Sequence, residues 1–339
     1  MSSKINFANI LVVRADRMGD VVLTTPFLKA LRKAYPAARI SILVASNAVD
    51  LVAGNPYIDE VLVDERQGRH RNVIGALKLA RDIRRRNFDA AFILFTKRRY
   101  NLACFLAGVP ARIGYRNEKM GFLLTHPLKD RRHFGEKHES EYCLDVLRAV
   151  GIDVDDQAAL DMLVPLRKDA EAWAVDWLKA QGADAGEIIA IHPGASDPAR
   201  CWPAAQYAQL IDRLMQRYNF KIVLIGDKAM MPIAAEILRL CPRQILDLSG
   251  RTSVAQLASL LSRCRMVIST DTGPVHLGAG VGITAIALFL RDLPGVNPER
   301  WKPLGPKSFF LSPQAVSVDG VLDLVEDILR KDSQGIFYW

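Results

Sequence analysis

The sequence predicts an α/β protein of two Rossmann-like, doubly wound parallel-sheet domains that face a central cleft. Three observations lead to this prediction. Short apolar runs alternate with helical segments of about 10–15 residues, a pattern typical of parallel sheets covered on both faces. A polar, aspartate-rich stretch near residues 153–161 interrupts that alternation. The chain has 339 residues, which is enough for two domains with a core each.

Residues 1–160 are expected to form the first domain. Its expected strands are Ile10–Val13, Ile40–Val44, Glu60–Val63, Ala90–Phe95 and Arg112–Gly114. Its expected helices are Val21–Ala34, Ile74–Arg86 and Glu139–Val150. The first of these helices should end before Tyr35-Pro36, because a proline disfavours helical geometry in the residue that precedes it.

Residues 161–320 are expected to form the second domain. Its expected strands are Ile188–His192, Lys221–Ile225, Gln244–Leu248, Met266–Ser269 and Ala285–Phe289. Its expected helices are Asp169–Gln181, Ala204–Arg217, Met231–Leu240 and Val254–Arg263. A last helix, Val321–Arg330, belongs to a C-terminal segment 321–339 that could pack on either domain, including back on the N-terminal one.

Positive charge is concentrated in the first domain. The net charge of the chain is +8, and residues 65–132 hold 17 Lys and Arg against 5 Asp and Glu. The arginines within 81–86 are expected to form a solvated helix face. Two loop clusters are better placed to bind a polyanion (nucleic acid, an anionic membrane or a phosphorylated substrate), because ligands meet such sheets at the loops. The clusters are Arg66, Arg69 and Arg71, and Lys97, Arg98 and Arg99.

Cysteine usage and hydropathy bear on the compartment. The five cysteines are scattered and lack the Cys-x-x-Cys spacing of a zinc site or redox pair. No apolar run approaches the roughly 20 residues of a membrane-spanning helix, and the N-terminus lacks a signal-peptide pattern. We therefore expect a cytoplasmic protein without a metal centre. Peripheral contact with the anionic inner face of the cytoplasmic membrane is one of the contacts that its basic surface allows.

The most informative motif is MVISTDTGPVHLGAG at residues 266–280. A buried-type strand there ends in hydroxyls and an acid, and a glycine turn opens a helix of small residues. Such a junction directs backbone N–H groups and the positive helix end toward one point, where an anion binds. The motif therefore predicts a phosphate site. The residues at this opening are Thr270, Asp271, Thr272, Gly273 and His276.

A second loop suited to phosphate follows the first strand of the second domain, in IHPGASDPARCWP at 191–203. The backbone N–H groups of Ala195 and Ser196 could hold phosphate oxygens while Arg200 supplies a bidentate charge. His192 is either a satisfied strand-end histidine or a ligand contact. Cys201 is expected to be structural, because no neighbouring residue suggests nucleophile chemistry.

The first strand of the chain leads into RADRMGD at residues 14–20 and then directly into a helix. Gly19 allows the tight turn, which places Asp20 in the first helical turn. An acid there commonly complements the helix dipole. Because the loop also supplies Arg14 and Arg17, a polar site is the other interpretation. The dinucleotide fingerprint G-x-G-x-x-G is absent.

Three loops at strand carboxyl ends are thus expected to converge on one cleft. One carries an acid and two carry anion-binding groups, which is the minimum for moving a group from a phosphate leaving group to an acceptor hydroxyl. The acid would remove the acceptor's proton. Cations and helix N-termini would stabilise the departing diphosphate.

At these motifs the chain resembles glycosyltransferase family 9, the ADP-heptose:lipopolysaccharide heptosyltransferases. The resemblance rests on RADRMGDVVLTTPFLKALRKAYP, FLAGVPARIGYR, IHPGASDPARCWP and LSGRTSVAQLASLLSRCRMVISTDTGPVHLGAG, in this order. It implies a GT-B fold, with the acceptor bound by the N-terminal domain and the nucleotide sugar by the C-terminal one. It also implies inverting transfer of heptose from ADP-heptose to the lipopolysaccharide inner core, with no obligatory metal and no cofactor besides the donor substrate.

Motifs and resemblance together assign the site residues, with Asp20 as the general base. Arg200 stands where the family usually has a lysine that binds the donor diphosphate. The expected donor-binding residues are His192, Gly194, Ala195, Ser196, Arg200, Asp227, Thr270, Asp271, Thr272, Gly273 and His276. The phosphorylated acceptor, lipopolysaccharide core or lipid A, is expected to contact Arg14, Arg17, Gly19, Arg66, Arg69, Lys97, Arg98, Arg99 and Arg116.

Two departures from the family pattern bear on the donor. Asp227 comes earlier than the acid that many members use on the adenosine ribose, and Phe289-Leu-Arg-Asp stands where many have Phe-Gly-Pro-Thr. A family 9 enzyme with another nucleotide sugar or another surface-polysaccharide acceptor is therefore the alternative. A third hypothesis is a nucleotide- or polyanion-binding module without catalysis. Nucleic acid is not an expected partner, because the sequence has no recognition helix and no aromatic-interleaved basic stripe.

Overall fold

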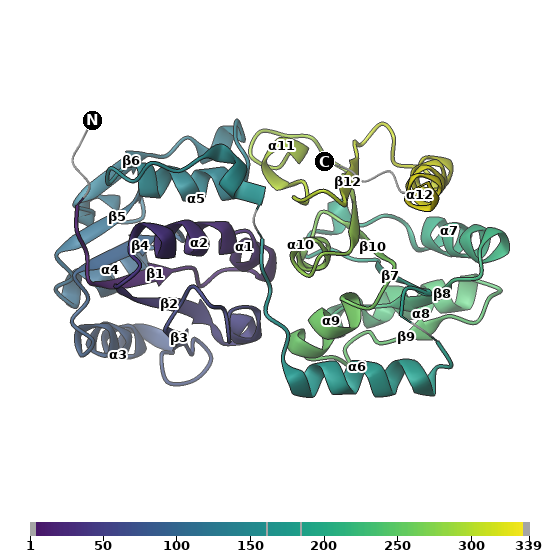
Figure 1. The fold of residues 1–339 in the computed structure, drawn as a ribbon, viewed down its shortest axis with the longest axis horizontal. Helices are drawn as coiled ribbons and strands as arrows, with labels where there is room; N and C mark the ends of the chain where they lie inside the picture. Colours follow the sequence, from purple (N-terminus) through teal and green to yellow (C-terminus); the bar gives the residue numbers. More distant parts are fainter. Residues whose placement is uncertain (1–4, 161, 184, 335–339) are drawn as a thin grey trace. The chain divides into compact units, whose positions relative to one another are not determined.

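The computed structural model describes residues 5–160, 162–183 and 185–334. The chain separates into two compact units, Met1–Pro165 and Leu166–Trp339. Each unit is a sheet with helices on both faces (Figure 1). Residue 161, where the predicted second domain begins, lies outside the described residues. So do residues 335–339 of the predicted C-terminal segment.

The described part of unit 1 holds a six-stranded parallel sheet in the order β3-β2-β1-β4-β5-β6. Its strands are β1 (Asn9–Val13), β2 (Arg39–Ala45), β3 (Glu60–Asp64), β4 (Ala90–Ile93), β5 (Ala111–Arg116) and β6 (His126–Lys129). Its helices are α1 (Met18–Val22), α2 (Thr25–Ala34), α3 (Asn72–Arg84), α4 (Arg98–Leu106) and α5 (Glu139–Arg148).

Unit 2 repeats this topology among its described residues, with the strand order β12-β11-β10-β7-β8-β9. Its strands are β7 (Ile188–His192), β8 (Lys221–Leu224), β9 (Leu246–Asp247), β10 (Met266–Thr270), β11 (Thr284–Leu288) and β12 (Ser308–Leu311). Its helices are α6 (Lys168–Ala180), α7 (Ala204–Arg217), α8 (Met231–Leu240), α9 (Val254–Leu261), α10 (Gly273–Gly280), α11 (Pro298–Trp301) and α12 (Val318–Ser333).

The predicted fold class of two doubly wound parallel sheets is confirmed. Central strands are buried on both faces, as their mostly apolar sequences predict. All five residues of β7, of β10 and of β11 are buried. In each unit the first and fourth strands are neighbours, so the strand order reverses between β1 and β4 and between β7 and β10. Ligands bind open α/β sheets at such a switch point, outside the carboxyl ends of the strands.

Several details differ from the sequence-based prediction. The single helix expected at 21–34 is two helices that meet at Leu23 and Thr24. Pro26 explains the break, because it has no N–H to donate and suits the first turn of a new helix. Strands β6 and β12 and helices α4 and α11 were not predicted. The sequence left open which domain the last helix packs on. Helix α12 packs on α7 in unit 2, where Val321 and Val325 join the buried cluster of that unit.

Candidate active site

The predicted loops of unit 1 follow β1 and β4, the two strands at its switch point. The loop after β1 holds Arg14, Arg17 and the start of α1. Gly19 is buried within α1, and Asp20 lies in the first turn of that helix. The residues Thr96 and Lys97 come after β4. The predicted acid and part of the predicted basic cluster therefore lie at the same edge of the sheet.

Arg14 binds the candidate base directly. One of its Nη2 hydrogen bonds goes to Oδ1 of Asp20 and another to Oε1 of Glu139, both at 3.0 Å. Its Nε donates to the main-chain carbonyl of Asp20 at 3.2 Å and lies 3.2 Å from Oδ1 of Asp16. The Arg14 side chain is 1% exposed, whereas that of Asp20 is 16% exposed. Arg14 thus fixes the orientation of Asp20 from the buried side, while Asp20 keeps access to solvent.

This arrangement changes the expected role of Arg14. Burial alone would lower the pKa of its guanidinium, but the surrounding carboxylates Asp16, Glu139 and Asp20, with Cys143, raise it well above the usual value. A permanent cation is therefore enclosed by three acids. We interpret Arg14 as a positioning residue for Asp20, and a direct contact with the acceptor stays a prediction. Glu139 was not predicted for the site, since a glutamate that opens a helix has an ordinary local explanation in the helix dipole.

Asp16 is a second acid at this site that the sequence did not single out. Burial raises its pKa to about 7, with Asp20 and Glu139 adding to the rise and Arg14 opposing it. Its folded-state pKa therefore lies above the usual value of 3.8. The folded protein holds this proton at pH values where the unfolded chain has lost it, so stability falls as the pH rises from about 4 to about 7.

Replacing Asp16 with Asn should remove this loss. We expect Asp16→Asn to stabilise the folded protein at pH 8.5 by on the order of 2–4 kcal/mol, with the gain shrinking toward pH 5. Thermal unfolding of both proteins across this range measures the difference. Asp59 is a control, because its pKa is shifted in the opposite direction. Burial tends to raise the pKa of Asp59, but hydrogen bonds from the Ile40 N–H and from Arg32 outweigh burial and lower it. An equal Asp16→Asn effect at every pH would contradict the prediction.

Several predicted acceptor residues have protein partners. Arg99 makes a two-pronged contact with the buried carboxylate of Asp64, at 2.9 Å and 2.8 Å, and also donates to the carbonyl of His70. Arg69 pairs with Asp82 at 2.7 Å, and Arg66 donates to the carbonyl of Ala15 at 3.0 Å. These contacts tie the loop after β3 to α4 and to the loop after β1. Arg99 is therefore a structural anchor of the basic loops as well as a candidate ligand.

The remaining predicted cations are exposed. Arg17, Lys97, Arg98 and Arg116 reach solvent. Partial desolvation lowers the pKa of Lys97, and the charges of Lys119 and Arg17 lower it further. Lys119 was not predicted, because a lysine in a charged turn carries no signal of its own. Such a group of cations at the carboxyl edge suits an anionic ligand.

The predicted donor loops of unit 2 follow β7 and β10, again at the switch point. His192 and Ser269 are paired in register on these two strands. Nδ1 of His192 lies 3.3 Å from Oγ of Ser269 and 3.2 Å from Oγ1 of Thr272, and the two hydroxyls are 2.8 Å apart. Burial lowers the pKa of His192 to about 4, against a small opposing effect of Asp227. His192 is thus a neutral histidine that organises the opening of α10.

Arg200 and Asp271 join the two donor loops. Nη1 of Arg200 donates to the carbonyl of Asp271 at 3.0 Å and to its Oδ2 at 3.3 Å. Nη2 of Arg200 lies 3.5 Å from Oγ of Ser196, and Oγ1 of Thr270 donates to the carbonyl of Gly194. The guanidinium is therefore held beside the N-terminus of α10. This combination of a fixed cation and a helix N-terminus is well suited to a diphosphate.

The other predicted donor residues lie around this pair. Gly194 packs under Met230, and a β-carbon there would come within 1.8 Å of the Met230 sulfur. Asp227 accepts a hydrogen bond from the N–H of Ala229 and so caps its own turn. His276 is buried within α10. Ala195 and Gly273 are placed by the same two loops.

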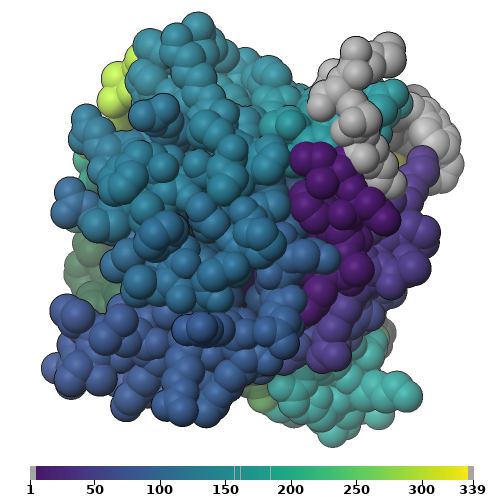
Figure 2. Space-filling model, turned by 90° about the vertical axis from the view of Figure 1, so that its left-hand side faces the viewer, coloured from purple at the N-terminus to yellow at the C-terminus, as the bar shows by residue number. Residues whose placement is uncertain are grey.

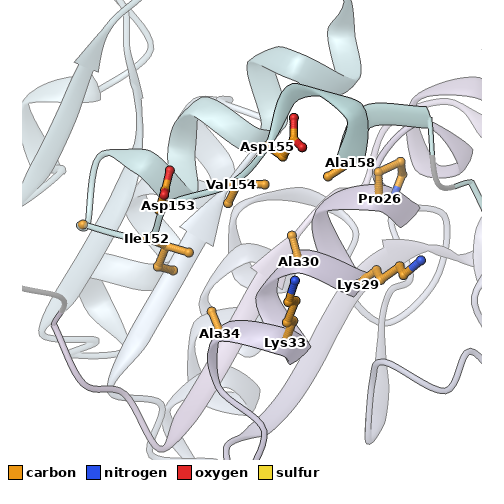
Figure 3. A pocket seen from close by; sticks show the side chains of 11 residues that line it. Pro26, Lys29, Ala30, Lys33, Ala34, Ile152, Asp153, Val154, Asp155 and Ala158 are labelled. Atoms are coloured by element: carbon orange, nitrogen blue, oxygen red, sulfur yellow. The ribbon is translucent and has the colours of Figure 1, made fainter.

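Two further observations concern what else the described residues hold. A pocket of about 490 Å³ in unit 1 lies between α2 and residues 151–158, with Lys29 and Lys33 opposite Asp153 and Asp155 (Figure 3). None of the predicted site residues lines it, so it is separate from the candidate site. In the described part of the chain, no three His, Cys, Asp or Glu side chains are grouped as a metal site needs, and no helix is long and apolar enough to cross a membrane.

Known proteins match over most of the chain. The model of "Glycosyltransferase family 9 (heptosyltransferase)" matches residues 76–316. A lipooligosaccharide heptosyltransferase 2 of Haemophilus influenzae is 25% identical over 312 residues, covering 88% of this chain and 87% of the relative. The residues matched by the family model include both donor loops and the second basic cluster.

Solved structures share the fold. A family 9 glycosyltransferase from Veillonella parvula superimposes with a TM-score of 0.88 at 22% identity, covering 98% of this chain and 100% of that one. An Escherichia coli heptosyltransferase solved with ADP gives a TM-score of 0.72 at 17% identity, covering 94% and 99%. The two parallel-sheet units are accordingly those of a GT-B fold. Since the family model covers well over half of the sequence, the chain belongs to glycosyltransferase family 9.

Proposed function

We propose that this enzyme transfers heptose from ADP-heptose to a phosphorylated lipopolysaccharide inner-core acceptor, with inversion at the anomeric carbon. The observation that carries the proposal is the Asp20 carboxylate, held by buried Arg14 at the switch point of unit 1. Unit 2 holds the Arg200–Asp271 pair at its own switch point. The heptosyltransferases among the relatives support the sugar, and the structure solved with ADP supports the nucleotide.

The reaction assigns one task to each group. Asp20 accepts the proton of an acceptor hydroxyl, and that oxygen forms a bond to the anomeric carbon from the face opposite the nucleotide. The bond from this carbon to the β-phosphate oxygen breaks, and its electron pair leaves with ADP. Arg200 and the N–H groups that open α10 stabilise the charge that develops on the diphosphate. In this proposal no cofactor besides the donor substrate takes part.

The acceptor and the membrane belong to the same proposal. The exposed cations Arg17, Lys97, Arg98 and Arg116, and Arg66 beside them in the fold, would contact phosphates of the core or of lipid A. Such an acceptor is carried by a lipid, so the enzyme would work in peripheral contact with an anionic membrane on its cytoplasmic side. These contacts rest on charge and placement at the carboxyl edge of unit 1.

A second candidate is a family 9 enzyme that uses another nucleotide sugar. It is favoured by Asp227, which caps its own turn, and by Arg291, which pairs with Asp197 of the donor loop at 3.0 Å. Both residues lie at positions where this chain departs from the family pattern. These two positions bear on the nucleobase and sugar contacts of the donor site.

A panel of nucleotide sugars separates the two candidates. We expect ADP-heptose to raise the unfolding temperature more than other ADP-, UDP- or GDP-sugars, because ligand at about 100 times its Kd adds about 2.7 kcal/mol of stability. Arg200→Ala should abolish the shift, whereas Arg243→Ala, which breaks an ion pair with Asp212 elsewhere in unit 2, should keep it. Mass spectrometry of a truncated lipopolysaccharide acceptor after reaction identifies the sugar added. If another nucleotide sugar raised the unfolding temperature more than ADP-heptose and the product carried that other sugar, heptose would not be the sugar transferred.

A further inference from the structure

Helix α3 of unit 1 exposes large apolar side chains. Val73 is 78% exposed, Ile74 65% and Leu77 55%. The opposite side of the helix is already used, since Leu79 and Ile83 are part of the buried core of unit 1. An exposed apolar cluster of this kind on one helix face usually marks an interaction surface.

Helix α4 extends the same surface. Leu106 is exposed at the end of α4 and lies with Leu77 in a groove of about 530 Å³ between the two helices. Arg81, Arg84 and Arg85 also line it. Figure 2 turns this side of unit 1 toward the viewer, and α3, in blue, runs along its lower part. We call the surface formed by these four apolar and three basic side chains the α3–α4 face.

The charge of the α3–α4 face is one-sided. Asp82 is the single acid in the sequence of α3, and it lies against Arg69 and His70, with Arg85 3.8 Å away. Within the described part of the chain, no carboxylate lies within 4.0 Å of Arg81 or Arg84. The exposed side of α3 is thus apolar over its first half and basic over its second half.

We propose that the α3–α4 face binds the surface of an anionic lipid bilayer. Apolar side chains beside arginines match a membrane interface, because the former enter the acyl boundary and the latter contact lipid phosphates. Nucleic acid offers nothing for Val73, Ile74 and Leu77 to contact. A symmetric contact with a second copy would bring the arginines of both copies together, which is unfavourable.

The position of the face fits a lipid-linked acceptor, and this step rests on the proposed function. Helix α3 follows β3 through the loop of Arg66, so its apolar first half begins at the carboxyl edge of the sheet. Arg66 in turn contacts Ala15 in the loop that leads to Asp20. A bilayer on the α3–α4 face would therefore lie next to the edge where the acceptor's sugar must reach Asp20.

Vesicle sedimentation tests the proposal with the full chain and without any nucleotide sugar. The wild-type protein should bind vesicles of phosphatidylglycerol and phosphatidylcholine far more tightly than vesicles of phosphatidylcholine alone. Val73→Ser/Ile74→Ser/Leu77→Ser and Arg81→Glu/Arg84→Glu/Arg85→Glu should each weaken binding by at least about tenfold. Met231→Ser/Leu240→Ser and Arg239→Glu, at exposed positions of α8 in unit 2, should bind as the wild type does.

Each contrary result has a definite meaning. Wild-type binding by both face variants, or absence of binding to anionic vesicles, overturns the proposal. The proposal is also overturned if the main effect of the variants is a change of oligomeric state or a loss of nucleic-acid binding. Because the replaced side chains are exposed, unchanged thermal unfolding shows that the variants fold. Transfer to a detergent-dispersed acceptor should stay unchanged in them, so failure of that activity in the wild type would contradict the proposed function and leave vesicle binding as a separate result.

Discussion

Asp20→Asn is expected to lower kcat by about 10²–10⁴-fold, the usual contribution of a positioned general base. The amide keeps an oxygen that can accept the 3.0 Å hydrogen bond from Arg14, so the loop after β1 should keep its conformation. What the amide lacks is the capacity to take a proton from the acceptor hydroxyl. Donor binding should change little, because the donor residues are all in unit 2.

Initial rates at saturating donor and acceptor measure this effect, and the thermal shift caused by ADP measures donor binding in the same protein. Asp16→Asn is the matched comparison. Asp16 lies 3.2 Å from the same guanidinium, and its pKa of about 7 is close to that of an efficient base. If Asp16→Asn abolished transfer while Asp20→Asn kept most of the wild-type kcat, Asp16 would be the base instead.

The fold was predictable from sequence wherever a strand is central. The runs at Ile10–Val13 and Ile188–Ile191 are apolar throughout, because both faces of these strands are buried. Strand β6 escaped prediction because it is an edge strand with alternate exposed residues and contains Pro127, which such positions tolerate. Strand β12, also at an edge, is likewise only partly buried.

The loops that form the site could be predicted from the sequence, but most of the contacts between their side chains could not. Strand–turn–helix junctions gave the positions of Asp20 and Asp271 from local pattern alone. The partner of Arg14 could not be found in this way, because Glu139 is 125 positions away and opens a helix like many other glutamates. Charge on a loop likewise says nothing about pairing, and Arg99 is bound to the buried Asp64.

Arg14→Met is expected to destabilise the folded protein by about 3–5 kcal/mol, the cost of removing one partner from a buried ionic cluster. Methionine fills much of the same volume with an unbranched chain, so the effect isolates the charge. Asp16, Asp20 and Glu139 would then lie close together without the cation that now separates them. Desolvation and mutual repulsion would raise their pKa values. The destabilisation should therefore be largest above pH 7 and shrink as the pH falls and the carboxylates take up protons.

Urea unfolding at pH 5.5 and pH 8.5 measures this dependence, and two further variants identify its cause. Arg14→Lys keeps the charge, but lysine lacks the planar fork with which arginine reaches several acceptors. Its free energy of unfolding should therefore lie between those of the wild type and Arg14→Met. Adding Glu139→Gln to Arg14→Met removes one of the stranded charges and should recover part of the stability, which a double-mutant cycle quantifies. A loss for Arg14→Met that is independent of pH and unrelieved by Glu139→Gln would mean that packing of the Arg14 side chain, and not its charge, holds the loop after β1. In that case the ion pair with Arg14 would not be what orients Asp20, and Arg14→Met should leave kcat per folded molecule unchanged.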